Sequence, residues 1–264
     1  MAAELDGFDS ESLTLDGAAR EVFIRGTGPA VVVVAEVPGI TPAVARLART
    51  VADAGFRVYM PQLFGVPGAE MTAAAIARTM AHVCISREFH VLAADHSSPV
   101  VDWLRALARH AHGICGGPGV GFIGMCLTGN FGIAMMLDAP VIAPVLCQPS
   151  LPIGLLPCQR RGLHASPAEL AAAHDKIEHE GARLLGLRFI QDFMSPPARF
   201  ERLRQEFGDA FEAIEIDARH ARPGTGIPAH SPLTTHLIDR PGEPTRAALD
   251  RTLAFLAERL TPAA

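Results

Sequence analysis

The segment Gly124 to Gly129, which reads Gly-Met-Cys-Leu-Thr-Gly, places a cysteine between a predicted strand and a predicted helix. A strained turn at such a junction lifts the side chain above the sheet, and small neighbours are needed because strand and helix nearly touch. The helix N-terminus that follows favours an anion, and the N–H of Leu127 is placed to bind an oxyanion. Cys126 is therefore a candidate nucleophile, although a buried structural cysteine would give the same pattern. Thr128 stands where glycine is usual in this kind of turn.

A thiol at this turn needs a base and a residue that orients the base. Strand-to-helix nucleophile turns are followed along the chain by an acid and then by a histidine, and Cys126, Asp192 and His230 occur in that order. Asp192 could also serve only as an acid near the start of the helix predicted at 196–206. His220 competes with His230, because it lies closer to the last predicted strand.

Glu36 directly follows a continuous apolar run, residues 30–35, that predicts a strand buried on both faces. A carboxylate in that place is costly to remove from water unless a partner satisfies it. Two interpretations remain open. Glu36 is either a partly solvated strand end or a carboxylate held near the thiol, where it would control the thiol proton.

The rest of the chain alternates strands with helices, which predicts an α/β fold with a mostly parallel central sheet flanked by helices. Ligands bind beyond the carboxyl ends of the strands in such sheets, where all four candidates stand. The predicted strands are 20–25 (an edge strand), 30–35, 56–60, 120–123, 141–146, 184–190 and 211–216. The predicted helices are 41–54, 73–83, 99–111, 127–137, 167–180 with Ser166 as N-cap, 196–206 and 245–260. Residues 218–233 predict a loop rich in proline and glycine.

Composition limits the classes of protein that fit. The 264 residues are 49% hydrophobic and 19% charged, which is enough apolar material for one domain over residues 1–264. The net charge is −5 and no basic cluster occurs, so a nucleic-acid partner is not expected. No apolar run approaches the roughly 20 residues of a membrane span, and the acidic N-terminus does not resemble a signal peptide.

These features predict a cytoplasmic protein without a membrane partner, whose five cysteines are reduced. No C-x-x-C pair occurs. His110, His112 and Cys115 form the remaining hypothesis for a metal site, but their spacing is poor and solvated histidines are the simpler interpretation. No metal or cofactor is expected.

Four pieces in order resemble dienelactone hydrolase and its relatives over about residues 20–260. They are Ala-Glu-Val-Pro-Gly-Ile at 35–40, Gly-Met-Cys-Leu at 124–127, Asp192 after its strand, and Ala-His-Ser at 229–231. The distance from His230 to the helical segment 251–256 is also similar to the family's, which selects His230 over His220. The resemblance implies an α/β-hydrolase fold and a Cys126–Asp192–His230 triad.

The resemblance also implies a mechanism, in which Cys126 attacks the carbonyl of a small-molecule ester or lactone. His230 pairs with the thiolate and later activates water, while Asp192 orients His230. Glu36 holds the resting thiol and takes its proton when substrate binds. The backbone N–H groups of Val37 and Leu127 form the oxyanion hole.

The residues expected to bind the substrate differ from those of the family. The family's arginine four residues after the histidine, which holds a substrate carboxylate, is replaced by Thr234. Arg87 corresponds loosely to a second such arginine or is a surface residue, and Arg160 or Arg161 could act in place of the missing one. The expected assembly is a monomer or small homo-oligomer. The alternative hypothesis is a non-catalytic α/β-hydrolase fold that binds a small ligand, and Thr128 is the feature that favours it.

Overall fold

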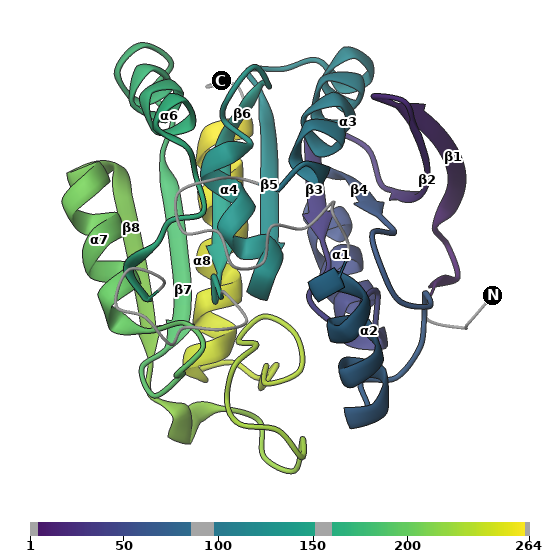
Figure 1. Cartoon of the computed structure of the whole chain (residues 1–264), viewed down its shortest axis with the longest axis vertical. Coiled ribbons are helices and arrows are strands. Elements are labelled where there is room, and N and C mark those ends of the chain that lie inside the picture. The colour runs from purple at the N-terminus through teal and green to yellow at the C-terminus, as the bar shows by residue number, and fades with distance from the viewer. Residues whose placement is uncertain (1–4, 86–97, 151–159, 262–264) are drawn as a thin grey trace.

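An eight-stranded sheet forms the centre of the computed structural model, which describes residues 5–85, 98–150 and 160–261 (Figure 1). The strand order is β1-β2-β4-β3-β5-β6-β7-β8. The strands are β1 (Asp9–Leu15), β2 (Ala18–Arg25), β3 (Ala30–Val34), β4 (Arg57–Pro61), β5 (Val120–Met125), β6 (Val141–Cys147), β7 (Leu184–Phe189) and β8 (Phe211–Ile216).

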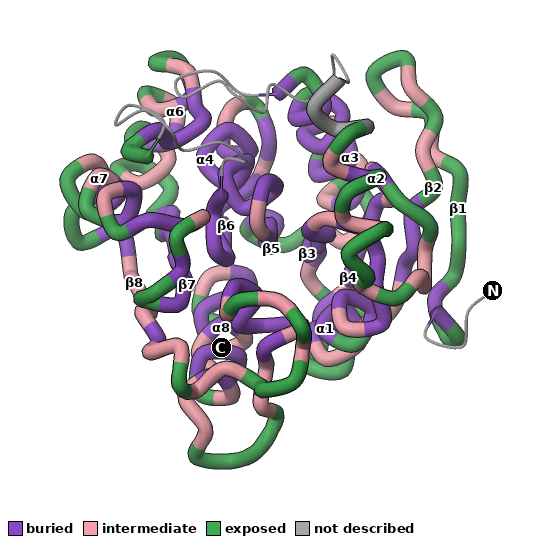
Figure 2. Tube along the Cα trace, turned by 60° about the horizontal axis from the view of Figure 1, so that its bottom comes forward, coloured by how far each residue is buried: buried purple, intermediate pink, exposed green. Residues whose placement is uncertain are grey.

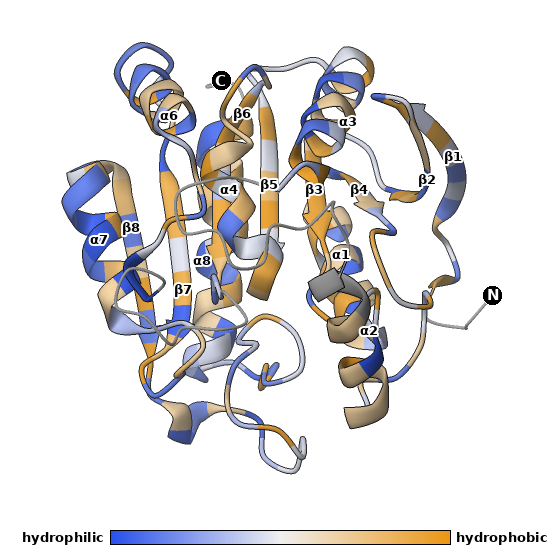
Figure 3. Cartoon of the chain, in the orientation of Figure 1, coloured by the Kyte–Doolittle hydropathy of each residue, from blue (hydrophilic) through white to orange (hydrophobic). Residues whose placement is uncertain are grey.

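The six strands from β4 to β8 in this order run parallel, and β1 and β2 join them antiparallel. Every residue of β3, β5, β6 and β7 is buried, because helices cover both faces of the sheet (Figure 2). Figure 3 shows the matching concentration of hydrophobic residues along the central strands. The predicted mostly parallel sheet is confirmed.

The edge of the sheet differs from the prediction. Residues 20–25 belong to β2, which pairs with β1 on one side and β4 on the other, so β2 is not the edge strand. The edge strand on this side of the sheet is β1, which the sequence did not reveal. Most of β1 is exposed, so it lacks the apolar alternation that marks a half-buried strand.

Helices pack on both faces of the sheet, with α1 and α8 on one face and α3 and α4 on the other (Figure 1). They are α1 (Pro42–Asp53), α2 (Ala73–Ile85), α3 (Val100–Cys115), α4 (Phe131–Ala134), α6 (Pro167–His179), α7 (Pro197–Phe207) and α8 (Pro244–Leu260). Short 3₁₀ turns are η2 (Cys126–Asn130), η3 (Gly208–Ala210) and η4 (Ala218–His220). No helix in the described ranges is both long and apolar enough to span a bilayer.

Local capping explains where two of these helices begin. The Thr41 hydroxyl accepts the Val44 N–H at 3.4 Å at the start of α1. Ser166 caps α6 as predicted, and the Glu169 carboxylate accepts the Ser166 N–H at 2.7 Å. Each cap satisfies N–H groups that have no partner within the helix.

Candidate active site

Cys126 occupies a strained turn at the carboxyl end of β5. Its φ angle is 57°, in the left-handed region that residues other than glycine seldom adopt. Gly124, just before it, must lack a side chain, because a Cβ there would collide with the carbonyl oxygen of Thr128. A Cβ on Gly129 would lie 2.6 Å from the carbonyl oxygen of Cys147 in β6. The turn thus forces Cys126 above the sheet, as a nucleophile turn requires.

The same tight packing explains why the helix predicted at 127–137 is shorter. The chain first makes the η2 turn, and α4 spans only Phe131–Ala134. Within η2, the fully buried Thr128 hydroxyl accepts the Met125 N–H at 2.9 Å and lies 3.1 Å from the Val34 carbonyl oxygen, to which it can donate. Thr128 therefore ties the turn to the end of β3, so its place in the turn is structurally accounted for.

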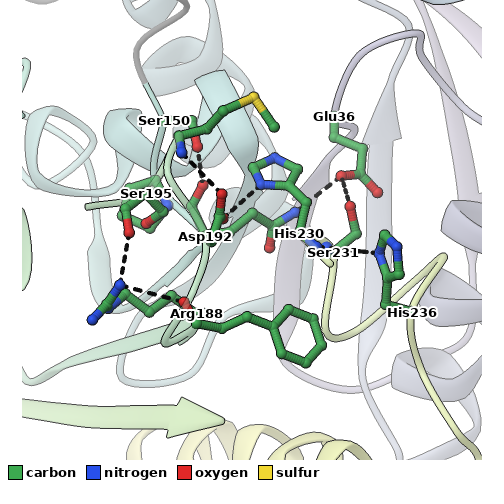
Figure 4. A network of polar contacts seen from close by, with 12 residues as sticks. Glu36, Ser150, Arg188, Asp192, Ser195, His230, Ser231 and His236 are labelled. Atoms are coloured by element: carbon green, nitrogen blue, oxygen red, sulfur yellow. Dashed lines mark hydrogen bonds and ion pairs between the residues drawn. The ribbon is translucent and has the colours of Figure 1, made fainter. Parts of the chain in front are cut away.

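His230 and Asp192 form a buried pair beside this turn (Figure 4). The distance from His230 Nδ1 to Asp192 Oδ2 is 2.7 Å. The second carboxylate oxygen of Asp192 accepts the Met194 N–H at 3.0 Å, which fixes the carboxylate in the loop after β7. The pair therefore leaves His230 Nε2 as the ring nitrogen available for chemistry.

Cys126 acts on His230 electrostatically. Burial disfavours the charged ring, but the negative charge of the Cys126 sulfur and the Asp192 carboxylate outweigh it, and the pKa of His230 rises well above its ordinary value. The His230 Nε2 atom is buried and has no hydrogen-bond partner in the described ranges. This arrangement suits a thiolate–imidazolium pair.

Glu36 lies directly after β3 and is almost wholly buried. Its carboxylate accepts hydrogen bonds from Gln148 Nε2 at 2.9 Å, Ser231 Oγ at 2.5 Å and Thr234 Oγ1. These partners are all neutral, and within the described chain Glu36 makes no hydrogen bond to Cys126. The hydrogen bond to the resting thiol that the resemblance implied is therefore not formed within the described chain, although both residues line one cavity.

That cavity has a volume of about 260 Å³. Cys126, His230, Glu36 and the two residues expected to form the oxyanion hole, Val37 and Leu127, all line it. The structure thus brings together five of the residues that the sequence singled out, together with Asp192 behind His230.

Residues 20–153, half of the chain, match the dienelactone hydrolase family. The chain belongs to the dienelactone hydrolase family. The matched segment includes Glu36 and Cys126, whereas Asp192 and His230 lie beyond it. No curated protein matches this chain.

Solved structures of similar fold cover nearly the whole chain of this dienelactone hydrolase family member. A protein assigned as a dienelactone hydrolase from Klebsiella pneumoniae is 17% identical, with 95% of this chain and 98% of that chain covered and a TM-score of 0.64. A dienelactone hydrolase-like promiscuous phosphotriesterase from metagenomic libraries is 16% identical, with 96% and 99% covered and a TM-score of 0.59. An α/β serine hydrolase without a lid from Xanthomonas campestris is 10% identical, with 98% of each chain covered and a TM-score of 0.55. At these identities the likeness establishes the α/β-hydrolase fold alone.

A second cysteine, Cys147, lies near the site in a different environment. Cys147 ends β6 and is fully buried, and burial, followed by the charge of Glu36, raises the pKa of its thiol well above the ordinary value. Cys126 is partly exposed and opens into the cavity. The thiolate is the reactive form of cysteine, so these surroundings favour Cys126 over Cys147 as nucleophile.

Two buried arginines that sequence reasoning missed hold the loops around the site. Arg188 in β7 pairs with Glu215 and donates to the Ser195 carbonyl oxygen at 3.0 Å, just beyond Asp192 (Figure 4). Arg199 in α7 donates to the carbonyl oxygens of Gly162 and Pro149. The pKa of Arg199 is lowered to about 10, and burial is the largest cause. Neither arginine belongs to a sequence motif that would single it out.

His236 supports the loop that carries His230. Its Nδ1 atom accepts the N–H of Ser231 at 3.1 Å and lies 3.4 Å from the N–H of His230. Its Nε2 lies 3.0 Å from the hydroxyl of Thr225. Burial, the largest cause, lowers the pKa of His236, which favours the neutral ring that this acceptor role needs. No sequence pattern distinguished His236 among eleven histidines.

Other candidates from the sequence lie elsewhere. His220 is in η4 and contacts the Arg219 guanidinium, away from the cavity wall. Arg160 and Arg161 are exposed. Arg87 lies outside the described residues. Within those residues, no group of three or more histidine, cysteine or acidic side chains is arranged to hold a metal ion, and His110, His112 and Cys115 form none.

Proposed function

We propose that this member of the dienelactone hydrolase family hydrolyses carboxylic esters or lactones with Cys126 as the nucleophile. The observation that carries the proposal is the shared cavity. A partly exposed Cys126, held at a strained turn, opens into the same space as His230, whose other nitrogen is paired with buried Asp192. A nucleophile, a base and an orienting acid in this relation are the parts of covalent acyl transfer.

In the first step, the Cys126 thiolate attacks the substrate carbonyl carbon, and the carbonyl oxygen takes up the negative charge. The backbone N–H groups of Val37 and Leu127, which border the cavity, would stabilise that oxyanion. Collapse of the intermediate expels the alkoxide, which takes a proton from the His230 imidazolium. A thioester on Cys126 and neutral His230 remain.

In the second step, neutral His230 removes a proton from water, and the resulting hydroxide attacks the thioester carbonyl carbon. Cys126 leaves as the thiolate, and His230 keeps the proton as imidazolium. The carboxylic acid is released and the starting charge pair is restored. Asp192 stabilises the charged ring at the beginning and end of the cycle.

We assign Glu36 the control of the thiol proton. Its carboxylate and the Cys126 side chain line one cavity, so a rotation of the carboxylate away from its neutral partners would bring it toward the sulfur. The hydrogen bonds from Gln148, Ser231 and Thr234 would then describe the carboxylate at rest. Where Cys126 rests as the thiol, this carboxylate would take its proton when substrate binds and pass it on to His230. The thiolate–imidazolium pair of the first step would then form, and Glu36 would be charged again.

The test is hydrolysis of an activated ester such as p-nitrophenyl butyrate by wild type and by Cys126→Ala. Turnover should disappear in the variant, and iodoacetamide should inactivate wild type while labelling Cys126 before Cys147. Full turnover in Cys126→Ala would contradict the proposal. If wild type binds esters but cleaves none, the non-catalytic alternative is favoured.

A further inference from the structure

Part of the cavity into which Cys126 opens is an apolar wall. This wall consists of six side chains, Met71, Ile76, Met80, Met194, Ile227 and Pro228. At about 260 Å³ the cavity lies just below the range of about 300 to 1,000 Å³ that is usual for small-molecule sites. It therefore suits a small apolar acyl group.

The described wall contains no arginine or lysine, and His230, the one basic side chain there, is already paired with Asp192. Thr234 stands where the resemblance led us to expect an arginine for a substrate carboxylate, and its hydroxyl instead donates to Glu36. Arg46 and Arg222 line a different cavity, of about 330 Å³. No arginine or lysine side chain therefore lines the described part of the substrate cavity.

Glu36 adds negative charge to the same wall. Its partners among the described residues are an amide and two hydroxyls, so no cation of this part of the chain hydrogen-bonds to it. A substrate carboxylate placed in this cavity would lose its water, meet no described arginine or lysine, and face a second carboxylate, while the His230 ring is already paired with Asp192. Each of these effects disfavours the bound anion.

We infer that the substrates of this site are uncharged esters or lactones with a small apolar acyl group, and that a carboxylate on the acyl group is rejected. This inference rests on the proposed function. Three of the six apolar wall residues are methionines, whose flexible side chains adapt to different shapes. The site should therefore tolerate changes in acyl shape and discriminate sharply on charge.

Esters with one leaving group and nearly equal acyl length test the inference. These are p-nitrophenyl butyrate, mono-p-nitrophenyl succinate, and methyl p-nitrophenyl succinate, in which the carboxylate is masked. The value of kcat/KM for the free succinate should be lower than for butyrate by on the order of 100-fold, because the site leaves the anion unpaired. The methyl ester should recover most of the difference. Equal or faster cleavage of the free succinate would overturn the inference.

A charge placed in the wall provides a matched test. Met80→Arg puts a cation into the cavity, whereas Ala77→Arg puts the same cation on the exposed side of α2. Met80→Arg should raise the succinate-to-butyrate ratio of kcat/KM by at least roughly 10-fold, since it supplies the missing partner. Ala77→Arg should leave the ratio unchanged. An unchanged ratio in both variants, with folded protein and measurable butyrate turnover, would count against the inference.

Arg87→Ala tests the arginine outside the described residues. The ratio should not change in this variant. A selective loss of succinate turnover would show that Arg87 binds the carboxylate and would overturn the inference. Failure of the proposed function gives a different result, namely that none of the three esters is cleaved or that Cys126→Ala cleaves them as well as wild type.

Discussion

Two buried carboxylates lie on opposite sides of the candidate site, and their partners differ. Asp192, in the loop after β7, is 3% exposed and contacts the ring of His230, a group that can carry positive charge. Glu36, after β3, is 1% exposed, and its hydrogen-bond partners in the described part of the chain are all neutral donors. Both are satisfied by hydrogen bonds, as buried carboxylates must be.

The difference in partners indicates that the two carboxylates have different roles in the reaction. A carboxylate that faces a titratable ring stabilises the positive charge on that ring, and this need persists through the whole reaction cycle. A carboxylate held by an amide and two hydroxyls can exchange one partner for another at lower cost, because no ion pair is broken. Loss of charge should therefore be more damaging at Asp192 than at Glu36.

Asp192→Asn should have the largest effect. The amide cannot stabilise the imidazolium and can enforce the wrong tautomer of His230, so kcat should fall by about 10⁴-fold. The measurement is p-nitrophenyl butyrate turnover at neutral pH, with circular dichroism as a control for folding. A loss of less than about 10-fold in folded protein would mean that the Asp192–His230 pair is mainly structural.

Glu36→Gln should have an intermediate effect. Glutamine keeps the size of the side chain and some of its hydrogen bonds but cannot accept a proton, so turnover should fall roughly 100-fold while the fold is kept. Because a negative neighbour disfavours a thiolate, its loss should also move the pH profile of Cys126 alkylation to lower pH. Unchanged turnover together with an unchanged alkylation profile would make Glu36 a structural residue only.

His236 should show the smallest effect and a dependence on pH. Its pKa is lower in the folded chain than the ordinary 6.5, so the unfolded chain takes up a proton first as the pH falls. Stability should therefore decrease as the pH drops below about 6.5, until the lower folded pKa is reached. His236→Asn keeps an acceptor near the Nδ1 position but does not titrate.

Melting temperatures of wild type, His236→Asn and His236→Ala at pH 7.5 and 5.5 check this prediction. The asparagine variant should lose less stability than wild type between the two pH values. The alanine variant should be less stable at both by about 1 to 3 kcal/mol, because buried N–H groups lose their acceptor. Identical acid sensitivity in wild type and His236→Asn would exclude His236 as its source.

The sequence predicted the parts of the molecule that depend on local pattern. The apolar run at residues 30–35 predicted a central strand, which the structure forms as β3 at Ala30–Val34. Positions after predicted strands indicated Glu36, Cys126 and Asp192, whereas the family resemblance was needed to select His230 over His220. The edge strand β1 was missed because most of it is exposed and polar, so it has no apolar alternation. The short length of α4 was missed because it results from tight packing against β6, which the sequence does not show. Contacts between segments that are distant along the chain leave no pattern in the sequence. The neutral donors around Glu36 come from residues 148, 231 and 234, and they meet only in the fold.

The central claim is that Cys126 forms the covalent acyl intermediate. The most direct test is to mix the protein with p-nitrophenyl butyrate, quench with acid during the first turnovers, and determine the intact mass and the modified peptide. A butyryl group on the peptide that contains Cys126, absent from Cys126→Ala, is the predicted result. A butyryl group on Ser150 or Ser231, which line the same cavity, would contradict the account, as would undiminished turnover by Cys126→Ala.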